Sequence, residues 1–171
     1  VGSGATAQCN CPSGMYSPAA STACTIAQQG YYAVDGNGDA TSLSAVGEKE
    51  AGDGYYACKT GDTDGTGVPS AADDECACPA GTHSEGTVDA CTTAPAGYYT
   101  VDTNDDPVTS AAVGVKQAQK GYYTVNGGGA ATNSGAVNEA SVGAGYYACD
   151  DTTDNDGTGV EACLLYTSDA A

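Results

Sequence analysis

The chain repeats itself in two consecutive segments, Gly97-Tyr98-Tyr99-Thr100-Val101-Asp102 and Gly121-Tyr122-Tyr123-Thr124-Val125-Asn126. The Gly-Tyr-Tyr triplet that begins both segments occurs five times, and successive triplets are 24, 43, 24 and 24 residues apart. A unit this short cannot bury its own apolar face, so the repeat predicts small units stacked on their neighbours. The triplets begin at Gly30, Gly54, Gly97, Gly121 and Gly145.

Each repeat is typical of a strand, a turn and a second strand. In the repeat from Gly30, alternate residues share one face of an extended segment, and Asp35 to Asp39 is rich in turn formers. We expect the return strand between Thr41 and Val46. The 25 glycines and the absence of a 3.6-residue period argue against helices.

The expected fold is therefore mainly β, with hairpins or a β-solenoid and much irregular coil. We expect the tyrosines of successive units to stack into a ladder. The tyrosines assigned to this packing are Tyr31, Tyr32, Tyr55, Tyr56, Tyr98, Tyr99, Tyr122, Tyr123, Tyr146 and Tyr147.

The composition leaves little material for a conventional core. Leucine, isoleucine, valine and phenylalanine number 3, 1, 13 and 0, and the net charge is −18. Such a composition alone is typical of disorder, so another feature must hold the chain in order. The 12 tyrosines and 9 cysteines are the candidates. Because cysteines at this density indicate disulfides, they predict an extracellular or cell-surface location.

Two cysteine modules share the pattern Cys-x-Cys-Pro-x-Gly-x-x-Ser, one from Cys9 to Ser17 and one from Cys76 to Ser84. A further cysteine follows each, at Cys24 and Cys91. The pattern resembles the short extracellular repeats of the ephrin-receptor-like type and the related GCC type. The resemblance implies a disulfide-stapled extracellular module and specifies no ligand.

The cysteine spacing suggests a connectivity, although sequence alone leaves other pairings open. Bridges inside the two matching modules would close loops of equal length. The suggested pairs are Cys11–Cys24, Cys78–Cys91, Cys58–Cys76 and Cys149–Cys163, with Cys9 either unpaired or bonded to another molecule.

Two acidic loops are the best candidates for chemistry. Each has two aspartates in alternation followed by glycine, an arrangement whose oxygens can surround Ca²⁺. The full EF-hand pattern is absent, because its closest approximation, from Asp35, has Ala40 and Val46 where glycine and glutamate are required. A solvated acidic turn and a weak calcium site both remain open. The candidate calcium ligands are Asp62, Asp64, Asp154 and Asp156.

Charge and motif content argue against several function classes. With 4 lysines against 22 acids, the chain has no basic stripe for nucleic acid and would be repelled by an acidic membrane. No run of residues is long and apolar enough for a membrane span. The single histidine, His83, matches Tyr16 of the other cysteine module, so we interpret it as a substituted aromatic. We therefore assign no catalytic residue, no organic cofactor and no enzymatic activity.

Hydroxyl side chains in the turns predict covalent modification. No Asn-x-Ser/Thr sequon occurs, whereas serine and threonine pairs lie near small residues and proline. We expect O-linked glycans on some of Thr41, Ser42, Thr92, Thr93, Thr109, Ser110, Thr152 and Thr153.

The two ends of the sequence differ from the repeats. The first residues read as linker without a signal-peptide pattern, so we expect an internal fragment. The residues from Leu164 to Ala171 resemble the conceptual translation of a sequencing adapter, and we expect them to be read-through. The expected segments are a first cysteine module (1–29), two repeats with an acidic loop (30–75), a second module (76–96), two repeats (97–144), a fifth repeat (145–162) and the tail (163–171).

Together these features predict an extracellular structural protein that assembles with copies of itself into a fibril or surface coat. Its style is similar to that of the cysteine-rich, tyrosine-bearing repeat proteins of protist surfaces, including subunits of flagellar hairs (mastigonemes) and ciliate surface antigens. The alternative is a calcium-dependent adhesion or receptor ectodomain that binds a partner.

Overall fold

The protein, seen in a computed structural model that describes residues 7–86, 90–149 and 164–167, is mainly β. No helix occurs in these residues, and the strands form seven two-stranded antiparallel hairpins. We number the hairpins 1 to 7 in chain order. The strands are β1 (Met15–Tyr16), β2 (Thr25–Ile26), β3 (Tyr31–Val34), β4 (Gly47–Glu50), β5 (Tyr55–Cys58), β6 (Asp74–Ala77), β7 (Thr82–His83), β8 (Thr92–Thr93), β9 (Tyr98–Val101), β10 (Gly114–Gln117), β11 (Tyr122–Val125), β12 (Asn138–Ser141), β13 (Tyr146–Cys149) and β14 (Leu164–Thr167).

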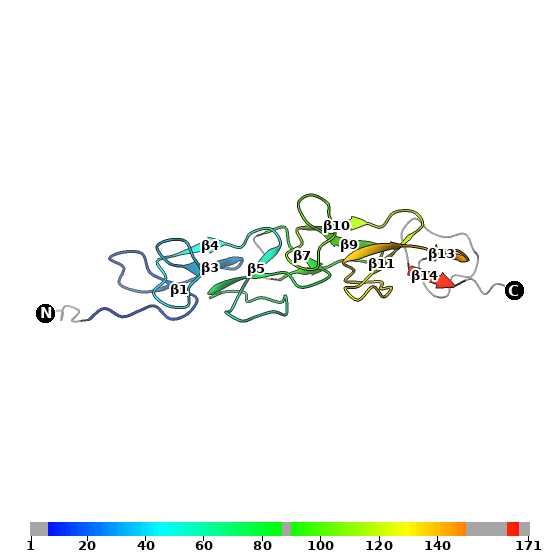
Figure 1. Ribbon diagram of the computed structural model, residues 1–171. Coiled ribbons are helices and arrows are strands. Elements are labelled where there is room, and N and C mark those ends of the chain that lie inside the picture. The colour runs from blue at the N-terminus through cyan, green and yellow to red at the C-terminus, as the bar shows by residue number, and fades with distance from the viewer. Residues whose placement is uncertain (1–6, 87–89, 150–163, 168–171) are drawn as a thin grey trace.

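The hairpins follow one another along an elongated rod (Figure 1). The chain advances from β1 near one end to β13 and β14 near the other, and each strand pairs only with its partner in the same hairpin. The tail strand β14 takes the place of the return strand in hairpin 7, where it pairs with β13. Each additional hairpin therefore lengthens the rod.

Every hairpin begins with the same turn. The N–H of the first strand residue donates to the carbonyl three residues earlier, as from Tyr31 to Gln28, and the seven N···O distances are 2.9 to 3.2 Å. The residue directly before the first strand residue has a φ of 75° to 86°, a left-handed conformation that favours glycine. The seven glycines are Gly14, Gly30, Gly54, Gly81, Gly97, Gly121 and Gly145.

Two of these glycines begin hairpins that lack the Gly-Tyr-Tyr triplet. Gly14 and Gly81 begin hairpins 1 and 4, which are the two cysteine modules. The modules are therefore short copies of the repeat unit. The 43-residue step between Gly54 and Gly97 contains the additional hairpin 4, which is the second cysteine module.

The expected return strand between Thr41 and Val46 was wrong. Hairpin 2 closes through β4, in which Glu50 pairs with Tyr31 and Gly47 with Val34. The earlier segment cannot extend as a strand because Ser44 has a φ of 59°.

Residues 41–46 instead contact the preceding hairpin, and we use the term joint for such a contact between consecutive hairpins. Ala45 forms a parallel bridge to Tyr16, and its carbonyl accepts the N–H of Ser17 at 3.0 Å. Three later joints repeat this bond with N···O distances of 3.0 to 3.1 Å. Their donor and acceptor residues are Ala33 and Ala72, Ser84 and Ala112, and Thr100 and Ala136.

The core is divided into small clusters. The second tyrosine is buried in three of the five doublets, at 2%, 0% and 3% exposure for Tyr32, Tyr56 and Tyr99, and half-buried in the other two. The first tyrosine is more exposed, at 37% for Tyr55. The three buried rings lie in three separate clusters with alanine, valine or cysteine side chains. These three rings therefore do not form the expected ladder among themselves, because each packs in its own cluster with small side chains.

Candidate functional site

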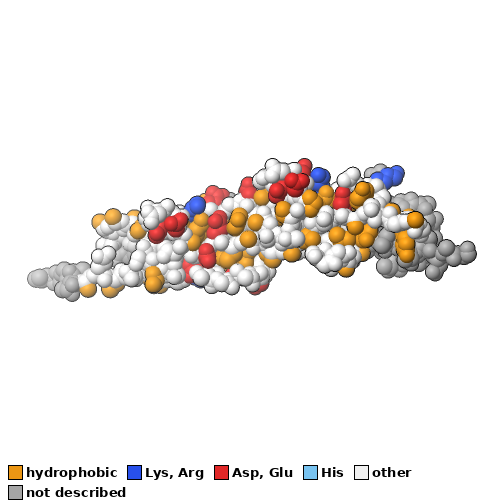
Figure 2. All heavy atoms as spheres, viewed as in Figure 1, with side chains coloured by type: hydrophobic (Ala, Val, Ile, Leu, Met, Phe, Trp, Pro, Cys, Tyr) orange, Lys and Arg blue, Asp and Glu red, His pale blue; other side chains and the backbone are white. Residues whose placement is uncertain are grey.

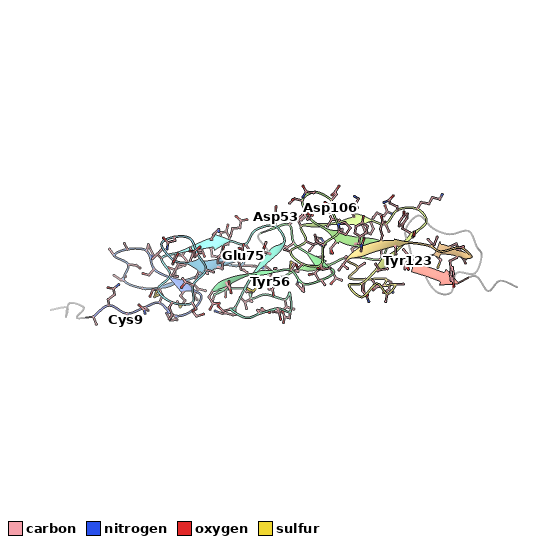
Figure 3. All side chains as sticks on the ribbon, viewed as in Figure 1. Cys9, Asp53, Tyr56, Glu75, Asp106 and Tyr123 are labelled. Carbon is pink, nitrogen blue, oxygen red and sulfur yellow. A yellow bond between two sulfur atoms is a disulfide. The ribbon has the colours of Figure 1, made fainter. Side chains whose placement is uncertain are left out.

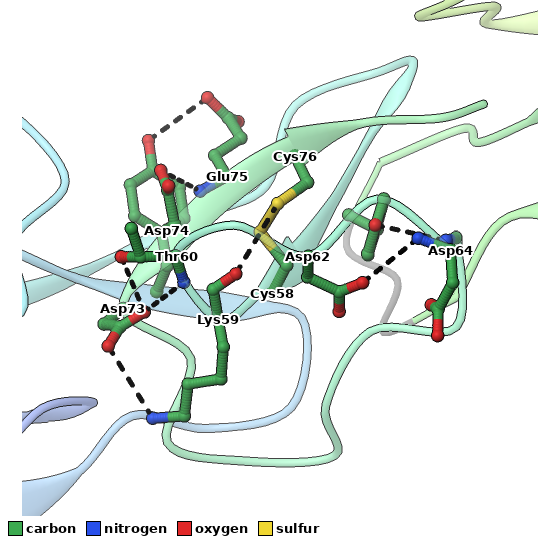
Figure 4. The surroundings of a disulfide bond; sticks show 12 residues. Cys58, Lys59, Thr60, Asp62, Asp64, Asp73, Asp74, Glu75 and Cys76 are labelled. Carbon is green, nitrogen blue, oxygen red and sulfur yellow. Dashed lines mark hydrogen bonds and ion pairs between the residues drawn. A yellow bond between two sulfur atoms is a disulfide. The ribbon is translucent and has the colours of Figure 1, made fainter.

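Three disulfides staple the first half of the rod. They join Cys11 to Cys24, Cys58 to Cys76 and Cys78 to Cys91, the pairs that the cysteine spacing suggested. Figure 4 shows the Cys58–Cys76 bond inside hairpin 3. Cys58 and Cys78 are fully buried against Tyr56, so these two disulfides also form part of the core.

The other three cysteines, Cys9, Cys149 and Cys163, are not part of these three disulfides. Cys9 is exposed near the N-terminal end of the rod and forms no disulfide within the described residues (Figure 3). Cys149 is buried in β13. Its suggested partner, Cys163, lies outside the described residues.

The acidic loop of hairpin 3 uses its aspartates to shape the backbone. Asp62 Oδ1 accepts the N–H of Asp64 at 3.1 Å, and Asp64 Oδ1 accepts the N–H and hydroxyl of Thr66 at 2.7 and 2.6 Å (Figure 4). The Thr66 bonds lower the pKa of Asp64. Within the described part of the chain, no group of three or more acidic, histidine or cysteine side chains is placed to hold a metal ion. The calcium hypothesis gains no support here, and Asp154 and Asp156 lie outside the described residues.

A buried aspartate beside this loop was missed by the sequence analysis. Asp73 is 4% exposed, and its Oδ1 accepts the N–H and hydroxyl of Thr60 at 2.8 and 3.2 Å. Its Oδ2 accepts the hydroxyl of Ser13 and lies 3.9 Å from Lys59 Nζ (Figure 4). Because Ser13 belongs to the turn of hairpin 1, this cluster joins hairpins 1 and 3.

Three long hairpins end in the same five-residue loop. The side-chain oxygen of the first loop residue accepts the N–H groups two and four residues later, at 2.8 and 3.1 Å for Asp35. Asp102 and Asn126 make the equivalent bonds in hairpins 5 and 6. These bonds lower the pKa of Asp35 and Asp102, because the accepted N–H groups favour the carboxylate.

These loops predict a loss of stability in acid. A carboxyl whose pKa is lower in the folded chain stabilises it above the unfolded pKa of about 3.9, and this contribution is lost as the pH falls through the folded value. We expect Asp35→Asn with Asp102→Asn to reduce the difference between urea midpoints at about pH 7 and about pH 3. Asn126 shows that an amide oxygen fits the loop. Asp39→Asn, at a residue that contributes backbone groups to the same loop, is the control for the loss of one negative charge near the loop.

A carboxylate clamp holds the turn at the start of a hairpin to the return strand of the same hairpin. Glu48 in β4 accepts the backbone N–H and side-chain Nε2–H of Gln28, both at 2.8 Å. It also accepts the hydroxyl of Tyr16 from the preceding hairpin at 3.4 Å. Burial, and then the charge of Glu48, raises the pKa of Tyr16. We use the term carboxylate clamp for this glutamate and the turn residue that it holds.

Two further glutamates repeat the clamp. Glu75 accepts the N–H of Gly52 at 2.7 Å and the hydroxyl of Tyr32 at 3.4 Å. Glu139 accepts the N–H and Nε2–H of Gln119 at 2.6 and 2.8 Å. Each glutamate lies at the same register position, opposite the residue that follows the second aromatic.

Hairpins 1, 4 and 5 change both partners of the clamp together. Where the turn begins with Pro12, Pro79 or Pro95, it offers no N–H. The facing residue in these hairpins is a cysteine or a valine, so no buried carboxylate is left without a donor. The replacements are Cys24, Cys91 and Val115.

His83 occupies the second aromatic position of hairpin 4. It forms a parallel bridge to Ala112, as Tyr16 does to Ala45, so its interpretation as a substituted aromatic is confirmed. Among the described side chains its Nδ1 is the one buried polar atom without a hydrogen-bond partner. It lines a depression of about 300 Å³ together with Ser84, Glu85, Ala90 and Thr92.

The candidate glycosylation sites differ in access. Thr41 is half-buried, and its hydroxyl donates to the Leu43 carbonyl at 2.8 Å. The side chains of Ser42, Thr92, Thr93, Thr109 and Ser110 are exposed, while Thr152 and Thr153 lie outside the described residues.

The visible face of the rod carries acidic, polar and hydrophobic side chains (Figure 2). Figure 2 shows acidic side chains along one edge of the visible face, with few lysines among them. The part of the chain that the structure describes has no helix that is long and apolar enough to span a membrane. Comparison with known protein families, curated proteins and solved structures found no match for this chain.

Proposed function

We propose that this chain is a structural segment of an extracellular, self-assembling fibril or surface coat. The observation that carries the proposal is a backbone bond that recurs at four of the joints between the described hairpins. The same backbone bond connects hairpins whose loops and side chains differ, with alanine as the acceptor in four joints. Because this joint uses backbone groups and small residues, further hairpins can be added without a new side-chain interface. This property suits a protein that forms long structures.

The charged edges of the rod disfavour lateral association and therefore favour association along its axis. The outer edges of the return strands have no partner strand, and such edges can aggregate. Charged residues occupy β4, as Glu48, Lys49 and Glu50, and β6, as Asp74 and Glu75. Together with the net charge of −18, they disfavour sideways pairing.

The extracellular setting rests on the disulfides. Three bridges among the described residues, in a chain with so little aliphatic core, fit a compartment that keeps cysteines oxidised. O-linked glycans on exposed hydroxyls such as Ser42 and Thr109 would add to the solubility of the sides. An intact mass of secreted material above that of the bare chain, lost on enzymatic removal of O-glycans, is the expected result.

The proposal is tested with the full chain secreted from eukaryotic cells. We expect sedimentation velocity to show concentration-dependent association, and electron microscopy to show particles that lengthen at constant width. A single monomeric species at all concentrations, with and without calcium, would contradict self-assembly. Monomers that bind Ca²⁺ by titration calorimetry and then capture a cell surface would favour the adhesion alternative.

A further inference from the structure

The first described residues match the return strand of hairpin 3. Residues 7–10 and the following Cys11-Pro12 align with β6 and Cys78-Pro79, with cysteine at the same two positions. In hairpin 3 this strand pairs with β5, and Cys76 is bonded to Cys58. Residues 7–10, which we call the N-terminal segment, are all exposed and pair with no strand among the described residues.

The residue after the N-terminal segment lacks a bond that its counterparts make. In hairpins 1 to 6, the residue after the return strand donates its N–H to the carbonyl of the starting glycine, as from Cys78 to Gly54, at 2.9 to 3.0 Å. Cys11 is only 4% exposed, but its N–H makes no hydrogen bond within the described residues. Because a backbone N–H removed from water is costly without an acceptor, this position favours the glycine carbonyl of another hairpin.

The loop of hairpin 2 also lacks contacts that later loops make. In three later hairpins, a left-handed loop residue donates its N–H to the carbonyl that follows the return strand two hairpins before, at 2.9 to 3.0 Å. These donors are Ala71, Ala111 and Gly135. Their counterpart Ser44, with a φ of 59°, is exposed and makes no such bond to Cys11 within the described residues. Val46 is 47% exposed, whereas its counterpart Val137 is 5% exposed. A hairpin completed on the N-terminal segment would place the Cys11 carbonyl as the acceptor for Ser44.

The other end of the rod carries the strand that matches the N-terminal segment. The sequence Tyr-Tyr-Ala-Cys occurs twice in the chain, in β5 and in β13. β5 already pairs with β6, while β13 lies near the opposite end of the rod from Cys9 (Figures 1 and 3). β14, which pairs with β13, contains neither the cysteine nor the carboxylates of β6. A second copy of this chain therefore offers the matching strand at the end that continues the rod.

We propose that the N-terminal segment of one copy replaces β14 on β13 of a second copy, and that Cys9 then bonds to Cys149 as Cys76 bonds to Cys58. The register of hairpin 3 places Cys9 opposite Tyr147, and the Cys11 N–H donates to the carbonyl of the glycine before β13. Because this contact joins the two different ends of the rod, it repeats along the axis without closing. The inference rests on the proposed self-assembly and specifies its contact.

The covalent step is thiol–disulfide exchange. Cys9 is exposed, so its thiolate can attack a disulfide of Cys149 once β14 has left. The bond between the two cysteine sulfurs forms, the former partner of Cys149 leaves as a thiolate, and that thiolate takes up a proton. Where Cys149 is a thiol, glutathione disulfide first forms the mixed disulfide with it and releases one glutathione thiol.

Disulfide mapping of the full chain tests this contact. Heavy-isotope-labelled and unlabelled chains are mixed in a glutathione redox buffer, alkylated and digested with pepsin without reduction. We expect a Cys9–Cys149 peptide pair that joins one labelled and one unlabelled half. Pairs that always come from a single chain, a Cys9–Cys9 bond, or Cys9 bonded to a cysteine of another protein would overturn the proposal.

Cysteine variants test whether the position of the thiol matters. We expect Cys9→Ser to lose the disulfide-linked species that the unaltered chain shows on non-reducing gels. Cys9→Ser with Ser42→Cys is the matched control, because it returns an exposed thiol at a different place in the same end of the rod. This control should not restore a bond to Cys149, and a restored bond would show unspecific oxidation and overturn the proposal.

Sedimentation velocity of the same samples separates this contact from self-assembly itself. Association of the unaltered chain without a Cys9–Cys149 pair would overturn the contact and leave self-assembly standing. A chain that stays monomeric at all concentrations would overturn both. The mapping of the unaltered chain decides alone if a variant fails to fold, because it needs no substitution.

Discussion

Replacing Gly81 with alanine is expected to lower the free energy of unfolding by about 3 to 5 kcal/mol. Gly81 has a φ of 77°, which an L residue adopts only with strain. A Cβ at this position would also lie 2.0 Å from the carbonyl oxygen of Gly135, in a loop of hairpin 6. Because that atom belongs to the backbone of another hairpin, the clash is relieved only if hairpins 4 and 6 move apart.

Gly121→Ala separates the two causes. Gly121 begins hairpin 6 with a φ of 82°, but a Cβ there meets no atom within 4 Å. We expect Gly121→Ala to lower the free energy of unfolding only by the cost of placing alanine at a positive φ, about 1 to 2 kcal/mol. Urea unfolding followed by tyrosine fluorescence measures both, since the chain has no tryptophan. Equal losses for the two variants would mean that hairpins 4 and 6 are not in backbone contact.

The contact at Gly81 belongs to a series. A Cβ on Gly14 would lie 1.7 Å from the Ala71 carbonyl oxygen, and one on Gly54 would lie 2.3 Å from that of Ala111. In each case the second residue has a φ of 51° to 62° and lies two hairpins further along. Each of these three loops therefore packs on the hairpin two places before its own, which makes the rod more cooperative than a string of nearest neighbours.

The fold class was predictable because the strand and turn signals are local. Alternation in Tyr-Tyr-x-Val and the turn residues after it require no knowledge of distant residues. The relation of the cysteine modules to the repeats was not predicted, because hairpins 1 and 4 lack the tyrosine doublet that marks the other hairpins. The signal was present in the turn itself, since Pro79-Ala80-Gly81 repeats as Pro95-Ala96-Gly97 immediately before the next hairpin.

The interactions between hairpins were less predictable. The disulfides close local loops of 13 or 18 residues, so spacing alone favoured them. The clamp requires the register, because Glu48 meets Gln28 only when β4 begins at Gly47 and not at Thr41. The bond between Ser13 and Asp73 joins residues 60 positions apart, and no sequence pattern connects them.

Removing the Cys78–Cys91 disulfide is expected to cost more than removing Cys11–Cys24, although both close loops of the same length. Each bridge spans 13 residues, so the loss of loop-closure entropy is the same, about 3 kcal/mol. The double variant Cys78→Ala with Cys91→Ala also removes sulfur atoms that pack on the fully buried Tyr56. We expect that packing loss to add about 1 to 2 kcal/mol.

The matched variant, Cys11→Ala with Cys24→Ala, measures the loss of loop-closure entropy in hairpin 1. Urea unfolding of the two double variants beside the native chain therefore isolates what the Tyr56 cluster contributes. Equal losses would contradict a role for the Cys78–Cys91 sulfurs in the core. A larger loss from the hairpin 1 variant would instead locate the more important core contacts at that end of the rod, where Cys11 is itself only 4% exposed.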